Sequence, residues 1–327
     1  MGAPSSHPVA LGGCARTGRY FPRRSSGAMA DLSVRIGEVA LKNPVIAASG
    51  TFGFGAEYAP IFDPGLLGGI CSKGITREPR EGNPPPRLWE TPCGLLNSIG
   101  LENPGIEAFV REVLPRMLEL GTVVIVNIWG REPEEYAYMA ERLDMTEAHV
   151  IELNLSCPNV PGAGLPGANP EKVAAIVAAA RAACGKPLWA KLPPEGDLIG
   201  AARAAAEAGA SAVTVANTFR GMAIDIRSRR PVFANVIGGL SGPAVKPLVL
   251  RAVYEVTKEV GIPVIGCGGI VGWEDAVEFI MAGAHAVQIG TGSFIDPLCI
   301  PKVIAGLGAF LEREGIGSLE EVRGCAH

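Results

Sequence analysis

Eight short apolar runs alternate with longer amphipathic segments along most of the chain. The runs are too short for helices and are expected to be buried strands; they cover residues 45–48, 69–72, 123–126, 150–153, 188–190, 212–216, 264–266 and 286–289. The longer segments have apolar residues at three- and four-residue spacing and are expected to be helices at 106–120, 133–143, 170–183, 198–208, 243–260, 273–282 and 301–314. Strands buried on both faces that alternate with helices pair in parallel. Eight such units predict an α/β protein with a closed (β/α)₈ TIM barrel.

Three further segments refine this architecture. "LSVRIGEVAL" (32–41) alternates apolar and polar residues on both sides of a glycine and predicts an N-terminal β-hairpin. The connections 76–105 and 220–243 are too long for simple loops, and because both follow strand ends they are expected to cover the C-terminal face of the barrel. A doubly wound sheet is the alternative fold, but "AASGTFGFG" (47–55) lacks the GxGxxG spacing that its first turn needs.

The first 28 residues differ in composition from the rest. They are rich in Gly, Pro, Ser and Arg, contain no Asp or Glu, and lack the apolar core of a secretory signal. An arginine-rich stretch without acidic residues is also typical of a transit peptide. Because Met29 directly precedes the patterned sequence, we interpret 1–28 as a disordered or non-native extension and 29–327 as a single domain.

Composition disfavours several classes of partner. The formal net charge of -4 provides no basic field for nucleic acid. The longest alanine-rich run, 173–180, is far shorter than the ~20 residues that span a membrane, so a cytoplasmic protein is expected. Eight cysteines without a CxxC pair argue against a zinc site, an iron–sulfur site or a disulfide framework in this chain, and no metal is expected.

Polar or small residues follow every apolar run, where a barrel builds its active site. They are Ser49, Lys73, Asn127, Asn154, Lys191, Asn217, Gly268, Gly269, Gly290 and Thr291. Any one asparagine could cap a helix and any one lysine could extend to solvent. Together they indicate a bound polar ligand, because buried amides and ammonium groups need partners. The glycines in "GCGGI" and "IGTGSF" also suit a phosphate held by backbone N–H groups, although glycines serve tight turns as well.

Cys157 in "NLSCPN" (154–159) stands apart from the other cysteines. Cys71, Cys184 and Cys267 are interpreted as small core residues. Cys157 lies beyond a strand and before a proline, where a thiolate could act as nucleophile or general base. The four histidines lie near the termini or just before strands, outside any matching motif, which disfavours a Cys–His hydrolase.

Several motifs in order carry a resemblance to a known family: "NPVIAASGTFGFG", "EGNPPPR", "LLNSIGLENPG", "ELNLSCPN", "ANTFRG" and "GGLSGPAVKP". From about residue 32 to 323 the sequence resembles class 1 dihydroorotate dehydrogenase, the flavin enzyme of pyrimidine synthesis. "FGFGAEY" and "GGLSGPAVKP" are more similar to the B subtype, which passes electrons to NAD through a separate subunit carrying FAD and an iron–sulfur cluster. The resemblance implies a homodimer associated with that subunit in a heterotetramer.

The resemblance also implies a site for FMN and dihydroorotate. FMN would be held by Ser49, Lys73, Gly74, Asn127, Asn154, Lys191, Ala216, Gly242, Gly268, Gly269, Gly290 and Thr291. Dihydroorotate would be held by Lys73, Asn97, Ser98, Ile99, Gly100, Leu101, Asn127, Asn154, Asn217 and Thr218. Cys157 would remove the C5 proton as the C6 hydride moves to flavin N5. A lysine near the pyrimidine end of the flavin would stabilise the negative charge that reduction places there.

Three alternatives remain open at the level of sequence. An A-subtype dihydroorotate dehydrogenase, a homodimer that uses fumarate, also lacks CxxC. A flavin-free barrel lyase or isomerase would bind a phosphorylated substrate in the glycine loops and form a Schiff base on Lys73 or Lys191. A non-catalytic scaffold subunit is disfavoured by the intact set of polar strand ends.

Overall fold

The computed structural model describes residues 30–156 and 165–327. Eight parallel strands form a closed barrel, because the last strand pairs with the first. In chain order they are β3 (Val45–Ala47), β4 (Gly69–Cys71), β7 (Val123–Ile128), β8 (Val150–Asn154), β9 (Leu188–Leu192), β10 (Ala212–Val215), β15 (Val264–Cys267) and β16 (Ala286–Ile289). Each of these strands matches one of the eight apolar runs, so the predicted (β/α)₈ barrel is confirmed.

Helices follow the barrel strands along the chain. They are α1 (Ile106–Ala108), the π-helical turn η3 (Phe109–Val113), α2 (Leu114–Leu118), α3 (Pro133–Asp144), α4 (Pro170–Ala183), α5 (Leu198–Glu207), α6 (Lys246–Glu259), α7 (Trp273–Met281), α8 (Gly292–Ile295) and α9 (Cys299–Glu314). Short 3₁₀ turns lie at Ala56–Tyr58, Pro64–Leu66, Pro166–Ala168, Pro243–Val245 and Leu319–Glu321. Local chemistry sets several ends: the Asn169 side chain accepts from the backbone N–H groups of Glu171 and Lys172 at the start of α4, and Gly315 ends α9 at φ +68°. All seven predicted helices are present, and among the α-helices of residues 30–156 and 165–327 only the four-residue α8 was not predicted.

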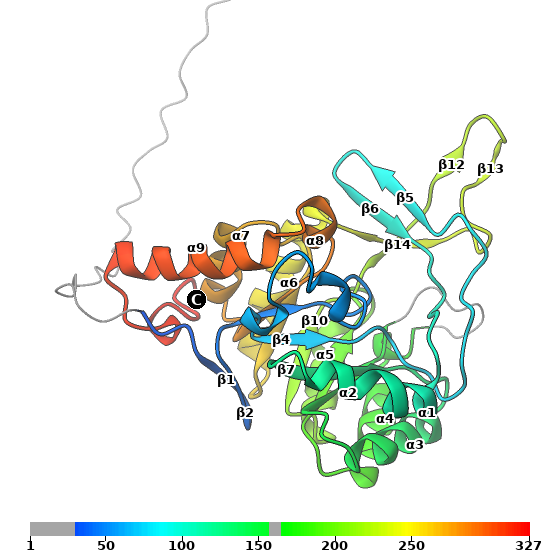
Figure 1. Cartoon of the computed structure of the whole chain (residues 1–327), viewed down its shortest axis with the longest axis horizontal. Helices are drawn as coiled ribbons and strands as arrows, with labels where there is room; N and C mark the ends of the chain where they lie inside the picture. The colour runs from blue at the N-terminus through cyan, green and yellow to red at the C-terminus, as the bar shows by residue number, and fades with distance from the viewer. Residues whose placement is uncertain (1–29, 157–164) are drawn as a thin grey trace, which may run out of the picture.

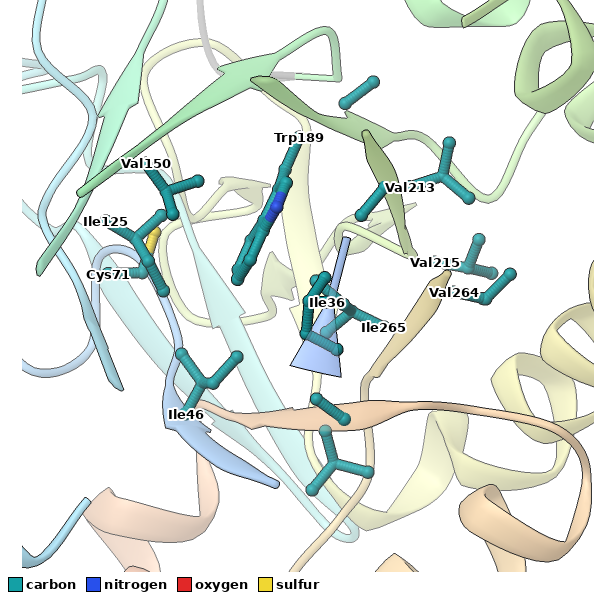
Figure 2. Close-up of a cluster of buried hydrophobic side chains, with 14 of the residues drawn as sticks. Ile36, Ile46, Cys71, Ile125, Val150, Trp189, Val213, Val215, Val264 and Ile265 are labelled. Atoms are coloured by element: carbon teal, nitrogen blue, oxygen red, sulfur yellow. The ribbon is translucent and has the colours of Figure 1, made fainter. Parts of the chain in front are cut away.

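The N-terminal hairpin lies against the amino end of the barrel. Strands β1 (Val34–Ile36) and β2 (Val39–Leu41) are antiparallel, and the chain reverses at Gly37, whose φ of +60° suits glycine. Ile36 is fully buried, and Figure 2 shows it among barrel side chains that include Trp189 and Ile265. The predicted hairpin therefore closes one end of the apolar barrel core and leaves the other end for ligands.

The two long connections join to form a cover over the opposite end. The first supplies β5 (Leu88–Thr91) and β6 (Gly94–Asn97), and the second supplies β11 (Phe219–Gly221) and β14 (Gly238–Ser241). These strands form one sheet in the order β11-β14-β6-β5, in which β14 and β6 run antiparallel. Figure 1 shows β5, β6 and β14 together beyond the barrel, with the hairpin of β12 (Ile224–Asp225) and β13 (Arg230–Pro231) projecting past them.

Three of the barrel strands include the polar residue that was expected just after them. Asn127 lies within β7, Asn154 ends β8 and Lys191 lies within β9. The apolar runs stopped at the first polar residue, whereas these strands continue because the polar side chains find hydrogen-bonding partners inside the barrel. Among the described residues, no helix combines the length and the apolar character that a membrane span requires.

Candidate active site

A deep cleft lies between the carboxyl ends of the barrel strands and the cover sheet. It encloses about 1370 Å³ of space, part of it open to solvent. Its walls include the predicted residues Ser49, Lys73, Gly74, Asn97, Ile99, Gly100, Leu101, Asn154, Lys191, Ala216, Asn217, Thr218, Gly242, Gly268, Gly269, Gly290 and Thr291. Positions spread over most of the chain are thus brought to one cavity.

Two predicted residues lie outside the lining of the cleft, and the position of a third is not described. Asn127 and Ser98 are buried behind the wall of the cleft rather than in it. The Asn127 amide oxygen still lies close to the cleft, since a Cβ built on Gly74 would be 3.1 Å from it. Cys157 lies outside the described residues, and the last residue described before it is Ser156.

The asparagines hold one another in place at the strand ends. Asn154 Nδ2 donates to Asn127 Oδ1 at 3.3 Å. Asn217 Nδ2 donates to Ser156 Oγ at 2.7 Å, and Asn217 Oδ1 accepts from the backbone N–H of Thr218 at 2.8 Å. These bonds fix which end of each amide faces the cleft, so the site presents a defined pattern of donors and acceptors to a ligand.

The two predicted lysines differ in their surroundings. Lys73 is half-buried at the cleft, and its ammonium forms no hydrogen bond or ion pair with another described residue. Lys191 is buried, donates to Gln288 Oε1 at 2.9 Å and lies 3.8 Å from Glu152 Oε1. Lys73 is therefore available to a ligand, whereas Lys191 is already part of a network inside the barrel.

Glu152 is the main functional residue that the sequence reasoning missed. Its carboxylate is fully buried below the cleft, where it accepts hydrogen bonds from Asn127 and Gln288. Burial would raise the pKa of the Glu152 carboxyl, but the Lys191 ammonium and these hydrogen bonds outweigh burial and lower it. Burial would likewise lower the pKa of Lys191, but the neighbouring Glu152 carboxylate helps to reverse the effect and raise it. Both groups are therefore charged.

The interpretation of the buried cysteines needs one correction. Cys71 and Cys184 are buried, as expected of small core residues. Cys267 is buried as well, but it also lines the cleft next to Gly268. Burial raises the pKa of the Cys267 thiol, so it faces the ligand space as a neutral group. Cys267 directly follows the apolar run 264–266, but its apolar side chain led to its interpretation as a core residue.

The glycine loops provide a cradle for a phosphate. Gly269 has φ +78°, and a Cβ there would lie 2.5 Å from the backbone of Lys246. Gly242 has φ +98°, and its Cβ would lie 2.8 Å from Gly94 Cα. The backbone N–H groups of Gly268 and Gly269 donate no hydrogen bond to any other described residue. Unpartnered N–H groups beside side-chain-free backbone fit an anionic phosphate.

Several other residues complete the cleft without having been predicted. They are Ala48, Gly50, Thr51, Leu88, Leu95, Glu102, Leu240, Ser241, Val245, Cys267, Ile270, Gly292 and Phe294. Most are neighbours of predicted residues in sequence, and Leu240, Ser241 and Val245 lie inside the motif "GGLSGPAVKP". Leu88 comes from β5 and Leu95 from β6, and no local pattern could reveal that β6 pairs with β14.

Comparison with protein families matches this chain to a family of enzymes. The family model described as dihydroorotate dehydrogenase matches residues 31–311. The chain belongs to the dihydroorotate dehydrogenase family. The resemblance read from the sequence motifs is thus confirmed, and dihydroorotate dehydrogenases depend on a flavin, which the phosphate cradle and the broad cleft fit.

Individual relatives in the dihydroorotate dehydrogenase family are similar over nearly their whole length. A protein of Thermoanaerobacter pseudethanolicus is 50% identical over 296 residues, which cover 90% of this chain and 98% of the relative. One of Bacteroides thetaiotaomicron is 50% identical over 299 residues, and one of Petrotoga mobilis 48% identical over 298, each covering 90% of this chain and 99% of the relative. All three are named dihydroorotate dehydrogenase B (NAD(+)), catalytic subunit.

Proposed function

We propose that this protein is the catalytic subunit of a B-type dihydroorotate dehydrogenase, which oxidises (S)-dihydroorotate to orotate in de novo pyrimidine biosynthesis. The observation that carries the proposal is the convergence in one cleft of oriented amides, a phosphate cradle and a lysine whose ammonium has no partner among the described residues. The names and identity of the relatives support the same activity.

We infer that the flavin is FMN and that it spans the cleft. Its phosphate would be held at Gly242, Gly268, Gly269, Gly290 and Thr291; at Gly242 and Gly269 a side chain would clash with the neighbouring backbone. Its ring would be contacted by Ser49, Lys73, Gly74, Asn127, Asn154, Lys191 and Ala216. A bound flavin supplies a hydride acceptor. The charged Lys191 would stabilise negative charge on the pyrimidine end of the ring.

Dihydroorotate would lie against the amide side of the cleft. Its ring carries alternating N–H and C=O groups, which amides can match as both donors and acceptors. The residues assigned to it are Lys73, Asn97, Ser98, Ile99, Gly100, Leu101, Asn127, Asn154, Asn217 and Thr218. Lys73 has no described partner and would provide a cation for the substrate carboxylate.

Cys157 is proposed as the general base. It follows Ser156, which accepts a hydrogen bond from Asn217 at the edge of the cleft. The Cys157 thiolate would take the C5 proton, while the C6–H electron pair leaves as hydride and the C5=C6 double bond forms. Proton and hydride both leave the substrate, so the two electrons lost by dihydroorotate are those gained by the acceptor.

We infer the electron acceptor and the partner subunit from the names of the relatives. We propose that a homodimer of this chain associates with a separate subunit that carries FAD and an iron–sulfur cluster and reduces NAD, in a heterotetramer. Residues 29–327 would form a single domain in a cytoplasmic enzyme that binds neither nucleic acid nor membrane. The A subtype remains the alternative, in which the lone chain would reduce fumarate.

The test uses the purified full chain, alone and with the co-purified subunit. We expect a yellow protein whose FMN is reduced by dihydroorotate, and we expect NAD reduction only when the second, iron-containing chain is present. Fumarate reduction by the lone chain would replace the B subtype with the A subtype. A colourless chain that takes up no FMN, and whose lysine is trapped with substrate by borohydride, would replace the dehydrogenase with a Schiff-base lyase or isomerase.

A further inference from the structure

A charged pair lies inside the barrel directly below the cleft, and the proposed reaction uses only one of its members. Glu152 of β8 and Lys191 of β9 stand on neighbouring strands, and their side chains are 0% and 5% exposed. Lys191 reaches the cleft, whereas Glu152 lines no part of it. Moving an ionised carboxylate out of water costs several kcal/mol. We therefore expect the buried Glu152 carboxylate to have a function that offsets this cost.

The surroundings of Glu152 are built for an ionised carboxylate. Oε1 accepts from Asn127 Nδ2 at 2.8 Å and from Cys71 Sγ at 3.2 Å. Oε2 accepts from Gln288 Nε2 at 2.6 Å and from Thr214 Oγ1 at 3.0 Å. Four donors converge on two oxygens, which favours the charged form over the protonated one.

Gln288 relays the effect of this carboxylate to Lys191. Because Glu152 can only accept, the Gln288 amide must turn its Nε2 toward Glu152. Its Oε1 then faces the other way and accepts from Lys191 Nζ at 2.9 Å. Glu152 thus supplies Lys191 with a counter-charge at 3.8 Å and also fixes the acceptor that orients it.

We propose that Glu152 is a positioning residue that holds Lys191 protonated and directed into the cleft. This inference rests on the proposed function, because it assigns Lys191 to the flavin ring. The charged and titratable groups that face Lys191 are Glu152, Cys71 and Cys267. Burial raises the pKa of both thiols, so they stay neutral and Glu152 is the anion of the group. A buried lysine without a counter-charge tends to lose its proton.

The test replaces the carboxylate with its neutral isostere. In Glu152→Gln, the new amide nitrogen would face two of the four hydrogen-bond donors, either Gln288 and Thr214 or Asn127 and Cys71, and in both orientations Lys191 loses its counter-charge. We expect the FMN dissociation constant to rise at least about tenfold, equal to ~1.4 kcal/mol. We also expect the midpoint potential of bound FMN to become more negative, because a neutral lysine no longer stabilises the reduced flavin.

Two further variants make the test specific. The swapped variant E152Q/Q288E moves the carboxylate to position 288, in direct reach of Lys191, and should return the dissociation constant to within about threefold of wild type. The matched control Glu107→Gln removes an exposed carboxylate that pairs with Arg142 on the surface, and it should change neither quantity.

The outcomes separate this inference from the proposed function. Unchanged FMN affinity and potential in Glu152→Gln would overturn the inference while the dehydrogenase assignment stands. A potential that becomes more positive would mean that Lys191 stays charged without Glu152, which also overturns it. If Glu152→Gln does not fold, the swapped variant E152Q/Q288E decides the question. A swapped variant that folds and binds FMN supports the inference, and a swapped variant that does not fold or does not bind FMN overturns it. Wild-type protein that takes up no FMN would overturn the proposed function itself.

Discussion

Replacing each of the two cleft lysines with methionine should have very different effects on the stability of the protein. Lys191→Met removes the cation from a buried pair and leaves Glu152 with no counter-charge. Breaking a buried pair in this way costs about 3–5 kcal/mol. At the ~2 °C or more per kcal/mol expected for a large domain, the melting temperature should fall by roughly 6 °C or more. Thermal melts followed by circular dichroism without added ligand measure this change.

Lys73→Met should behave in the reverse way. Its ammonium has no described partner within the protein, so its loss should change the free energy of unfolding by no more than ~0.5 kcal/mol. A hydrogen bond from a charged group to a ligand is worth ~1.5–3 kcal/mol, so the dissociation constant of orotate should rise roughly 10- to 150-fold. Flavin absorbance changes on titration with orotate measure the binding.

Lys191 and Lys73 serve as controls for each other, because both substitutions remove one positive charge from the same cleft. Equal losses of melting temperature in the two variants would refute the distinction between a partnered and a free lysine. A Lys191→Met protein with the melting temperature of wild type would show that burial of the Glu152 carboxylate does not need the Lys191 counter-charge.

Three other perturbations test separate parts of the molecule. Cys157→Ala should slow flavin reduction by dihydroorotate ~10²-fold or more in stopped-flow experiments while FMN stays bound; an unchanged rate would remove Cys157 as the base. Gly269→Ala should weaken FMN binding, because its Cβ would lie 2.5 Å from the Lys246 backbone at a φ of +78°; fluorescence titration with FMN gives the constant, and wild-type affinity would argue against the cradle. Burial, together with the charge of Arg323, lowers the pKa of His285 to about 4 from 6.5, so the unfolded chain binds this proton first as the pH falls. The free energy of unfolding should therefore decrease as the pH drops from about 6.5 to about 4, and His285→Gln should flatten that part of the curve in denaturant titrations; a curve that His285→Gln leaves unchanged would exclude this contribution.

The barrel and most of the cleft could be predicted because both depend on local sequence. A short apolar run in the sequence indicates each strand. In a closed parallel barrel, the residue at the carboxyl end of each strand lies at the same end of the barrel, where the active site is built. Residues such as Ser49, Lys73 and Asn217 could therefore be assigned to the cleft once the strands were recognised. Assigning them to FMN or to substrate needed the family resemblance, and that assignment stays a prediction.

The polar interior could not be predicted, since it depends on contacts between distant strands. Glu152 and Gln288 are 136 residues apart in sequence, and each lies inside a run that reads as apolar. Asn97 and Gly239 are 142 residues apart, and nothing in either segment indicates that β6 pairs with β14. Periodicity reports which face of a strand is buried, but it does not report which side chains meet there.

The pairing of β6 with β14 has a consequence for recombination between relatives. If only one of the two insertions came from a relative, its strand would pair with a strand of different sequence. Close packing such as that of Gly94 against the Ser241 carbonyl would then clash or leave a gap. Mispaired strands become free edges, which invite association between molecules. Functional chimeras should therefore inherit residues 76–105 and 220–243 from the same parent, as one module that happens to be encoded in two pieces.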